Sequence, residues 1–437
     1  MLTGVAAISL RDEVTGLLQE LIRLDTVNPP GNETEAAELL QTYLESRGVE
    51  CRLYARSPER ANLVARIRGR DPAAPRLLFL SHTDTVIADP AEWTLDPWSG
   101  EVRDGEVWGR GALDMKGQVA ASAVAVASLA AEGFEPAGDL IFAAAADEEV
   151  GRSFGLSWLC SEHPEAVRAT YCVNEGGGDR IEIRGKALYL CATSEKASSP
   201  FKIRIRGRSG HASMPGIADN ALVKSAALLE RLAEIETPLS LLPETRAFLS
   251  ALLGDVPKPA KALTRLGEAS PATAAMIEPM LRATISPTQI EASAQTNVIP
   301  GRCEITCDCR ILPGQTQEEI ERLLRDTLGH DGYELEWLGC VGCSRSVADT
   351  PLWEAVESFV EREELGASLV PVLLAGFTDS HYLREAFGTI AYGFFPSRAM
   401  PPEVAARLIH SADERVPIDD LELGTRFLVD VARELLH

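Results

Sequence analysis

The residues of this chain that could do chemistry most directly are a histidine and a carboxylate at the end of an apolar run. His82 and Asp84 lie in the segment Ser81-His82-Thr83-Asp84, directly after the apolar residues 77–80. On an extended backbone, residues two apart project from the same face, so both side chains point the same way. A histidine so placed could bind a metal ion through one ring nitrogen while the carboxylate holds the ring in a single tautomer.

Acidic clusters further along the chain also favour metal binding, because each of them lies next to an apolar segment, as His82 and Asp84 do. In an open parallel sheet the carboxyl ends of the strands share one edge, and sites form there. Carboxylates that meet at such an edge repel one another unless a cation lies among them. One imidazole with several carboxylates suits zinc, and less selectively cobalt or manganese. The acidic residues concerned are Asp114, Glu148, Glu149 and Glu175.

Each cluster taken alone has an ordinary interpretation. Asp114 precedes an apolar helix and could cap it, the Glu148-Glu149 pair could lie in a solvated loop, and Glu175 could belong to a glycine-rich turn. A centre with two metal ions also needs a second histidine, and the chain has seven histidines. His410 is the best placed of these, because it follows an apolar helix and precedes the acidic pair Asp413-Glu414.

Length, charge and cysteine content limit the protein class. The 437 residues are too many for one ordinary core, so two domains are expected. Lys and Arg number 42 against 65 Asp and Glu, and the net charge of −23 argues against nucleic acid or an anionic membrane as a partner. Residues 1–10 carry no secretion signal, and the Ala-rich stretch 119–131 is too short to span a bilayer. Nine scattered cysteines fit a reducing cytoplasm.

The order of the expected elements predicts an α/β catalytic domain with an insertion. Strands alternate with helices over residues 1–196, which indicates a mostly parallel sheet with helices on both faces. Residues 197–345 instead contain alternating apolar and polar strands around the Pro- and Ala-rich stretch 238–287, as expected of a separate α+β domain. The α/β pattern resumes over 346–437. The insertion would explain the long gap between Glu175 and His410.

Several motifs together resemble a known family. The chain is similar, over nearly its whole length, to the aminoacylase, carboxypeptidase G, acetylornithine deacetylase and succinyl-diaminopimelate desuccinylase family of di-zinc metallopeptidases. As a set, the motifs match the family in order and spacing. They are Asn28-Pro29-Pro30-Gly31, Ser81-His82-Thr83-Asp84, residues 109–117, Asp147-Glu148-Glu149, residues 207–213 and Thr296-Asn297-Val298-Ile299-Pro300.

The resemblance implies a centre with two zinc ions. One ion would be held by His82, Asp114 and Glu175, and the other by Asp114, Glu149 and His410, so that Asp114 bridges the pair. Glu148 is implied as the general base that takes a proton from a water between the two ions, and Asp84 as the residue that orients His82. A glutamate that is not a metal ligand keeps its lone pairs free for this proton transfer.

The inserted block would be the family's lid and dimerisation domain, here residues 197–345. The resemblance implies that His211 stabilises the oxyanion, and in dimeric relatives this histidine reaches the active site of the partner subunit. Asn297 and Arg310 match positions implied to hold the carboxylate of the substrate, and Thr378 lies in a loop that resembles a substrate loop. Arg310 could equally form a salt bridge at the edge of its strand. The stretch 238–287 is longer than in the smallest relatives.

We therefore expect a cytoplasmic, metal-dependent amidohydrolase or exopeptidase, and the resemblance adds a homodimer. Its substrate would be a small N-acyl amino acid or dipeptide-like molecule with a free carboxylate. The first alternative is a non-catalytic, metal-stabilised binding protein of the same fold, which predicts damage to the ligands or the base. The second is a thiol enzyme that uses Cys340 or Cys343, but this single CxxC pair has no histidine motif beside it.

Overall fold

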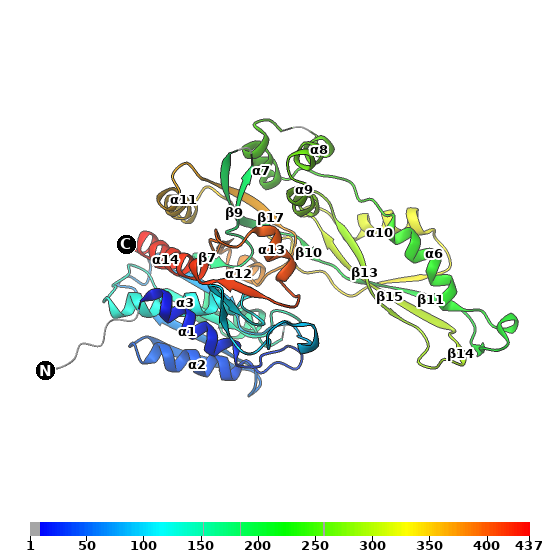
Figure 1. Ribbon diagram of the computed structural model, residues 1–437, viewed down its shortest axis with the longest axis horizontal. Helices are drawn as coiled ribbons and strands as arrows, with labels where there is room; N and C mark the ends of the chain where they lie inside the picture. Colours follow the sequence, from blue (N-terminus) through cyan, green and yellow to red (C-terminus); the bar gives the residue numbers. More distant parts are fainter. Residues whose placement is uncertain (1–8, 152, 184, 257) are drawn as a thin grey trace. The chain divides into compact units, whose positions relative to one another are not determined.

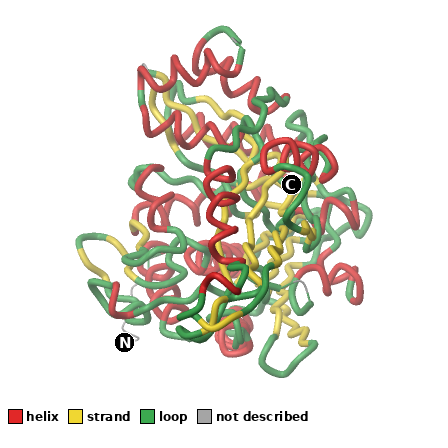
Figure 2. Tube along the Cα trace, turned by 90° about the vertical axis from the view of Figure 1, so that its right-hand side faces the viewer, coloured by secondary structure: helices red, strands yellow, loops and turns green. Residues whose placement is uncertain are grey.

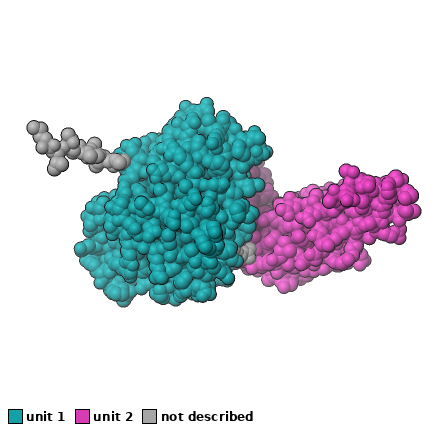
Figure 3. Space-filling model, turned by 90° about the horizontal axis from the view of Figure 1, so that it is seen from below, with its two compact units in different colours: residues 1–193, 345–372, 378–437 teal, residues 194–344, 373–377 magenta. Residues whose placement is uncertain are grey.

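The computed structural model describes residues 9–151, 153–183, 185–256 and 258–437. The prediction that no secretion signal is present concerned residues 1–10. Residues 1–8 of that stretch lie outside the described part. The chain forms two compact units, coloured separately in Figure 3. Unit 1 comprises Met1–Thr193, Arg345–Val372 and Thr378–His437, and unit 2 comprises Ser194–Ser344 and Leu373–Phe377.

A nine-stranded sheet forms the centre of unit 1 (Figure 1). Its four middle strands run parallel, whereas β1, β2 and β9 are antiparallel to their neighbours. The α/β class is thus confirmed, and the four middle strands form a parallel part of the sheet. In the order of the sheet, the strands are β1 (Glu50–Ala55), β2 (Ala61–Ile67), β6 (Leu140–Ala145), β3 (Leu77–His82), β7 (Tyr171–Asn174), β18 (Ile390–Gly393), β9 (Lys186–Glu195) and β17 (Ser368–Leu374), and β8 (Arg180–Ile183) pairs with β9.

Helices cover both faces of this sheet, and Figure 2 shows helices in red and strands in yellow. Leu77 and Phe79 of β3 pack in one apolar cluster, whereas Leu78 and Leu80 pack in another. This alternation explains why the strand is apolar at nearly every position. The first cluster includes α1 (Leu10–Ile22), α2 (Thr34–Glu45), α3 (Lys116–Ala131), α11 (Pro351–Glu363) and α14 (Ile418–Leu435). The second includes α4 (Leu156–Glu162), α5 (Pro164–Val167) and α12 (Ser380–Phe387).

The polar residues singled out in the sequence follow strands that end at the same edge of the sheet. His82 is the last residue of β3 and is in parallel register with Ala145, the last residue of β6. Glu175 comes directly after β7, which is parallel to β3. A small second sheet contains β4 (Val102–Arg103), β5 (Glu106–Trp108) and β19 (Arg415–Pro417). In this sheet β5, which precedes Asp114, pairs with β19, which follows His410.

Unit 2 is an antiparallel sheet packed against helices. Its core contains Cys303, Cys307 and Cys309, which are fully buried. The strands are β10 (Ala197–Ser198), β11 (Phe201–Arg206), β13 (Thr284–Glu291), β15 (Arg302–Ile311) and β16 (Glu334–Trp337), and α6 (Ala221–Ala233) and α10 (Gln317–Leu328) complete the core. A separate pair joins β12 (Gly210–His211) to β14 (Val298–Ile299).

The stretch 238–287 forms three helices and the start of β13. The helices are α7 (Pro243–Leu253), α8 (Pro259–Ala269) and α9 (Pro271–Ile277). The end of this stretch is tied to the sheet by Lys196, whose buried ammonium donates hydrogen bonds to the carbonyl oxygens of Pro279 and Arg282, each at 3.0 Å. Burial lowers the pKa of Lys196 to about 8.

The described helices include none with the length and apolar character needed to cross a membrane. All nine cysteines lie in the described part of the chain, and each is a free thiol.

Candidate metal centre

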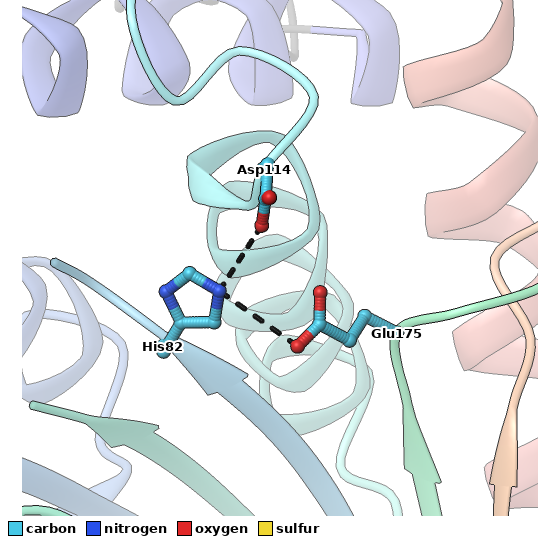
Figure 4. Close-up of side chains that lie close together, drawn as sticks. All are labelled: His82, Asp114 and Glu175. Atoms are coloured by element: carbon cyan, nitrogen blue, oxygen red, sulfur yellow. Dashed lines mark hydrogen bonds and ion pairs between the residues drawn. The ribbon is translucent and has the colours of Figure 1, made fainter. Parts of the chain in front are cut away.

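Three residues from separate elements of unit 1 form the first candidate metal site (Figure 4). The Nε2 atom of His82 lies 3.1 Å from Oδ1 of Asp114 and 3.8 Å from Oε1 of Glu175. His82 is 2% exposed at the end of β3, and Asp114 lies in the loop that leads into α3. Each residue offers one ligand atom, and the three atoms lie within 4.8 Å of one another, which is close enough to share one ion.

The second candidate site contains Asp114, Glu149 and His410. The Nε2 atom of His410 lies 3.1 Å from Oδ2 of Asp114 and 3.1 Å from Oε2 of Glu149. The two oxygens of Asp114 thus face different histidines, because Oδ1 is turned to His82. A carboxylate shared in this way can bridge two cations.

The crowded carboxylates and the two histidines shift one another's pKa values, and the pKa values of both histidines are raised. Hydrogen bonds to Asp114 and Glu149 raise the pKa of His410 to about 10. Burial raises the pKa of Glu175 to about 8, and the negative charge of Asp114 adds to that rise. Burial alone would raise the pKa of Asp114 too, but its bonds to His410 and His82 lower it. Dications could replace these protons as the compensating charge.

The donor set fits a divalent cation. Oε1 of Glu149 is buried and accepts no hydrogen bond from any described residue, so an acceptor is left for an ion. Imidazole nitrogens with carboxylate oxygens are typical zinc ligands. The alternative that Asp114 caps a helix is wrong, since Met115 is the N-cap residue of α3 and no side chain bonds to that end.

Glu148 lies beside the centre without belonging to either triad. Burial raises the pKa of its carboxyl group well above the usual range, the positive charge of His82 opposes this rise, and the negative charge of Glu175 adds to it. Its backbone N–H donates to Oδ1 of Asp84 at 3.1 Å. A glutamate with a raised pKa beside metal ligands can accept a proton from water and release it again.

Asp84 contacts more than the histidine it was expected to orient. Its backbone oxygen lies 3.0 Å from Nδ1 of His82, whereas its carboxylate Oδ1 lies 3.5 Å from that nitrogen. The carboxylate instead accepts the backbone N–H groups of Glu148 and Glu149 and a side-chain N–H of Asn28. Asp84 therefore links β3 to the loop that carries the candidate base.

Three residues that position the candidate ligands have no role predicted from the sequence. Asn28 bonds to Asp84 at 2.9 Å and to Asp147 at 3.1 Å. Glu414 and Arg110 form a buried ion pair of 2.6 Å beside the loop of Asp114. The available signals were the Asn28-Pro29-Pro30-Gly31 motif and the acidic pair after His410, but neither signal reveals a partner distant in the chain.

Two of the substrate residues expected in unit 2 lie together. His211 and Val298 pair in β12 and β14, and the N–H of Ala212 donates to the backbone oxygen of Asn297 at 3.0 Å. Nδ1 of the exposed His211 accepts a hydrogen bond from the N–H of Ser213 at 3.2 Å. In the neutral ring, Nε2 then carries the proton and can donate to a ligand.

Arg310 and Thr378 each form a hydrogen bond with a residue two positions away in the chain. Nε of Arg310 donates to both carboxylate oxygens of Asp308 at 3.0 and 3.1 Å, so the salt bridge considered as its alternative role is present. Thr378 is buried, and its hydroxyl oxygen accepts the N–H of Ser380 at the start of α12.

The thiol alternative finds no support in the CxxC segment. Burial raises the pKa of Cys343 to about 11, which works against the thiolate that nucleophilic catalysis needs. Cys340 is exposed.

Comparison with known proteins connects this centre to a family of hydrolases. Residues 78–434 match the model of peptidase family M20/M25/M40. A succinyl-diaminopimelate desuccinylase of Rhodospirillum centenum is 35% identical over 256 residues, which is 55% of this chain and 62% of that enzyme. A desuccinylase of Cereibacter sphaeroides is 27% identical and covers 93% of this chain and 94% of its own length. The human N-fatty-acyl-amino acid synthase/hydrolase is 27% identical over 84% of this chain and 75% of its own length.

Solved structures share the fold over nearly the whole chain. An M20 family metallo-carboxypeptidase of Sulfolobus solfataricus has a TM-score of 0.75 at 18% identity and covers 97% of this chain and 99% of its own. The dipeptidase Dug1p of Saccharomyces cerevisiae has a TM-score of 0.73 at 15% identity, with coverages of 98% and 96%.

Proposed function

This chain belongs to peptidase family M20/M25/M40, a family of metal-dependent hydrolases, and from that premise we propose a specific reaction and site. The protein hydrolyses the amide bond of a small N-acyl amino acid or dipeptide-like molecule with a free carboxylate. Two zinc ions are held by the two triads that share Asp114. The observation that carries this proposal is the placement of Glu148 beside two complete triads. An inactive binding protein of the same fold would be expected to lack one of these parts.

Glu148 has the central role among the protein groups. When bound, the ions lower the pKa of water and polarise a carbonyl oxygen. Glu148 takes the proton of the attacking water and delivers it to the departing amine. Its raised pKa favours this second step, since a carboxyl group that holds a proton more tightly can serve as general acid. Asp84 positions Glu148 through its backbone N–H.

We assign to unit 2 the roles of lid and of substrate clamp. Nε2–H of His211 is free to donate to the developing oxyanion, a contribution worth about 3 kcal/mol in comparable sites. Asn297 and the remaining N–H groups of Arg310 bind the substrate carboxylate, for which a planar guanidinium is well suited. Thr378 is the substrate contact from unit 1.

Distances within unit 2 support a dimer in which His211 acts on the partner subunit. The segment around His211 pairs with β14, which precedes β15, whereas Arg310 lies near the end of β15. Eight residues of extended strand separate Arg302 from Arg310, which is about 26 Å at 3.3 Å per residue. A dipeptide-sized molecule is much shorter, so Arg310 of one chain cannot grip the same substrate as that chain's His211 or the neighbouring Asn297. We therefore propose that His211 and Asn297 act together on the site of the partner subunit.

The surface near His211 also suits an interface between two copies. Met214, Ile217 and Val223 are 53%, 62% and 68% exposed. Apolar side chains grouped in this way favour burial against a partner. We further place the enzyme in the cytoplasm, where its nine free thiols would stay reduced.

A substrate panel tests the proposed reaction. Zinc- or cobalt-loaded protein is incubated with N-acetyl, N-formyl, N-succinyl and N-fatty-acyl amino acids and with dipeptides, and free amine is measured. The names of the relatives direct attention to the N-succinyl and N-fatty-acyl classes. Release of amine from one class supports the assignment. Absence of release from all classes, by protein that holds two ions, would favour the binding-protein alternative.

Mixed dimers test the role of His211. His211→Ala and Glu148→Gln each inactivate a homodimer. If His211 acts on the partner subunit, subunit exchange creates mixed dimers with one intact site and restores about a quarter of the wild-type activity. If His211 acts within its own subunit, the mixture stays inactive and the dimer proposal fails.

A further inference from the structure

Glu414 is a fully buried carboxylate whose hydrogen bonds converge on the loop of Asp114. One of its oxygens accepts the backbone N–H of Leu113 at 2.8 Å and that of Asp114 at 3.0 Å. The other accepts the N–H of Gly111 at 3.1 Å and a guanidinium N–H of Arg110 at 2.6 Å. Three backbone N–H groups of the ligand loop are thus bonded to a single side chain, and the N–H of the bridging aspartate is one of them.

Arg110 extends this connection to the loop of His410. Its second terminal nitrogen donates to the backbone oxygen of Ser411 at 3.0 Å, and the N–H of Gly109 donates to the backbone oxygen of Glu414 at 2.9 Å. The pairing of β5 with β19 continues the same connection, with Trp108 opposite Arg415. Side-chain and backbone hydrogen bonds therefore join two segments that are distant in the chain.

The loop of His410 needs such support from its surroundings. His410 and Asp413 have φ angles of 60° and 61°, a left-handed conformation that residues other than glycine adopt only where neighbouring contacts hold them. The side chain of His410 is 51% exposed, so burial does little to fix it. Gly111, on the opposite loop, has a φ of 86°, and a Cβ there would lie 2.8 Å from Thr85. Glycine therefore lets the loop of Asp114 lie against Thr85 and Lys116 in this conformation.

From this geometry we infer that Glu414 and Arg110 are positioning residues that set the distance between Asp114 and His410. They act on the second triad, because the first triad takes His82 and Glu175 from the ends of sheet strands. Neither residue touches the reacting atoms. The inference rests on the proposed two-ion site and adds residues that determine how tightly the second ion is held.

Cobalt titration of the metal-free protein tests this inference. Wild type, Glu414→Gln and the control Glu403→Gln are compared by metal content after gel filtration and by visible absorption. Glu403 is exposed on α13 (Pro402–Leu408), so its variant makes the same chemical change in the same segment without touching the ligand loop. We expect wild type and the control to bind two ions, and Glu414→Gln to bind the first normally and the second 10- to 100-fold more weakly.

Activity supplies a second readout that separates positioning from a general structural defect. Excess cobalt should restore kcat in Glu414→Gln, because the second site is weakened and not removed. If Glu414→Gln does not fold, Arg110→Lys decides, since lysine keeps the charge beside Glu414 but cannot also reach Ser411. Two ions bound with wild-type affinity by the folded variant would overturn the inference. A wild-type protein that binds fewer than two ions would instead overturn the proposed function.

Discussion

The two triads share Asp114 but hold their other ligands by different means. In the first triad, His82 ends a central strand and is 2% exposed, and Glu175 follows the neighbouring strand. In the second, His410 is 51% exposed and lies in a loop. Hydrogen bonds of the sheet fix the first pair of ligands, whereas side-chain contacts through Asp84, Arg110 and Glu414 fix the second. We therefore expect the first ion to be bound more tightly than the second.

Asp114→Asn should have the largest effect, because Asp114 is the only residue common to both triads. The amide keeps the shape of the side chain but loses the negative charge that bridges the cations. Metal analysis should show that both equivalents are lost, and turnover should fall to background. Retention of one full equivalent would mean that the triads do not depend on each other through Asp114.

Glu148→Gln should leave both triads filled and still lower kcat by about 10²- to 10⁴-fold. The amide cannot accept a proton from water, while none of the metal ligands changes. Metal content and activity are measured on the same sample. Near-normal turnover would contradict the role of Glu148 as general base, and lost metal would mean that Glu148 also serves as a ligand.

His82→Ala and His410→Ala should differ in their effect on the metal-free fold. Removal of the buried His82 leaves carboxylates without their compensating charge, which should lower the free energy of unfolding by about 3 kcal/mol or more. His410 is half exposed, so its removal should cost less than about 1 kcal/mol. Urea unfolding with chelator present measures both. Equal losses would show that burial does not distinguish the triads.

The pH dependence of the metal-free protein should show a smaller effect. The pKa of His410 is about 10 in the folded protein, above its unfolded value of about 6.5. The stability gained from its protonation is complete below pH 6.5 and is lost as the pH rises towards 10. Between pH 7 and pH 9.5, the free energy of unfolding should therefore fall less in His410→Ala than in wild type. An identical decline in both would contradict the raised pKa.

The sequence predicted those parts of the fold that depend on local pattern. The apolar helix expected after Asp114 is α3, and the apolar runs before His82 and Glu148 are parallel strands. Strand direction at the sheet margins depends on partners, so the antiparallel β2 and the unrecognised β9 could not be deduced from the pattern. The helices α7 and α8 within 238–287 bury apolar residues at helical spacing, but that spacing does not reveal the surface against which they pack.

The proposed metal ligands were more predictable than the residues that position them. Ligands had to be histidines and carboxylates after apolar segments, and the structure brings all five together. Glu414 is such a carboxylate, but its partners are three backbone N–H groups and Arg110, about 300 residues away in the chain, and local sequence pattern reveals neither kind of partner. Asn28 is likewise recognisable only by its contact with Asp84.

The position of β18 has a consequence for the synthesis of this protein. This strand, Ile390–Gly393, comes from near the carboxyl end of the chain but lies inside the sheet, between β7 and β9. Until the ribosome has made it, β7 presents an open edge with unpaired amides that can recruit other strands. Nascent or prematurely terminated chains should therefore be prone to aggregate and to need chaperones, although most of their helices and strands already exist.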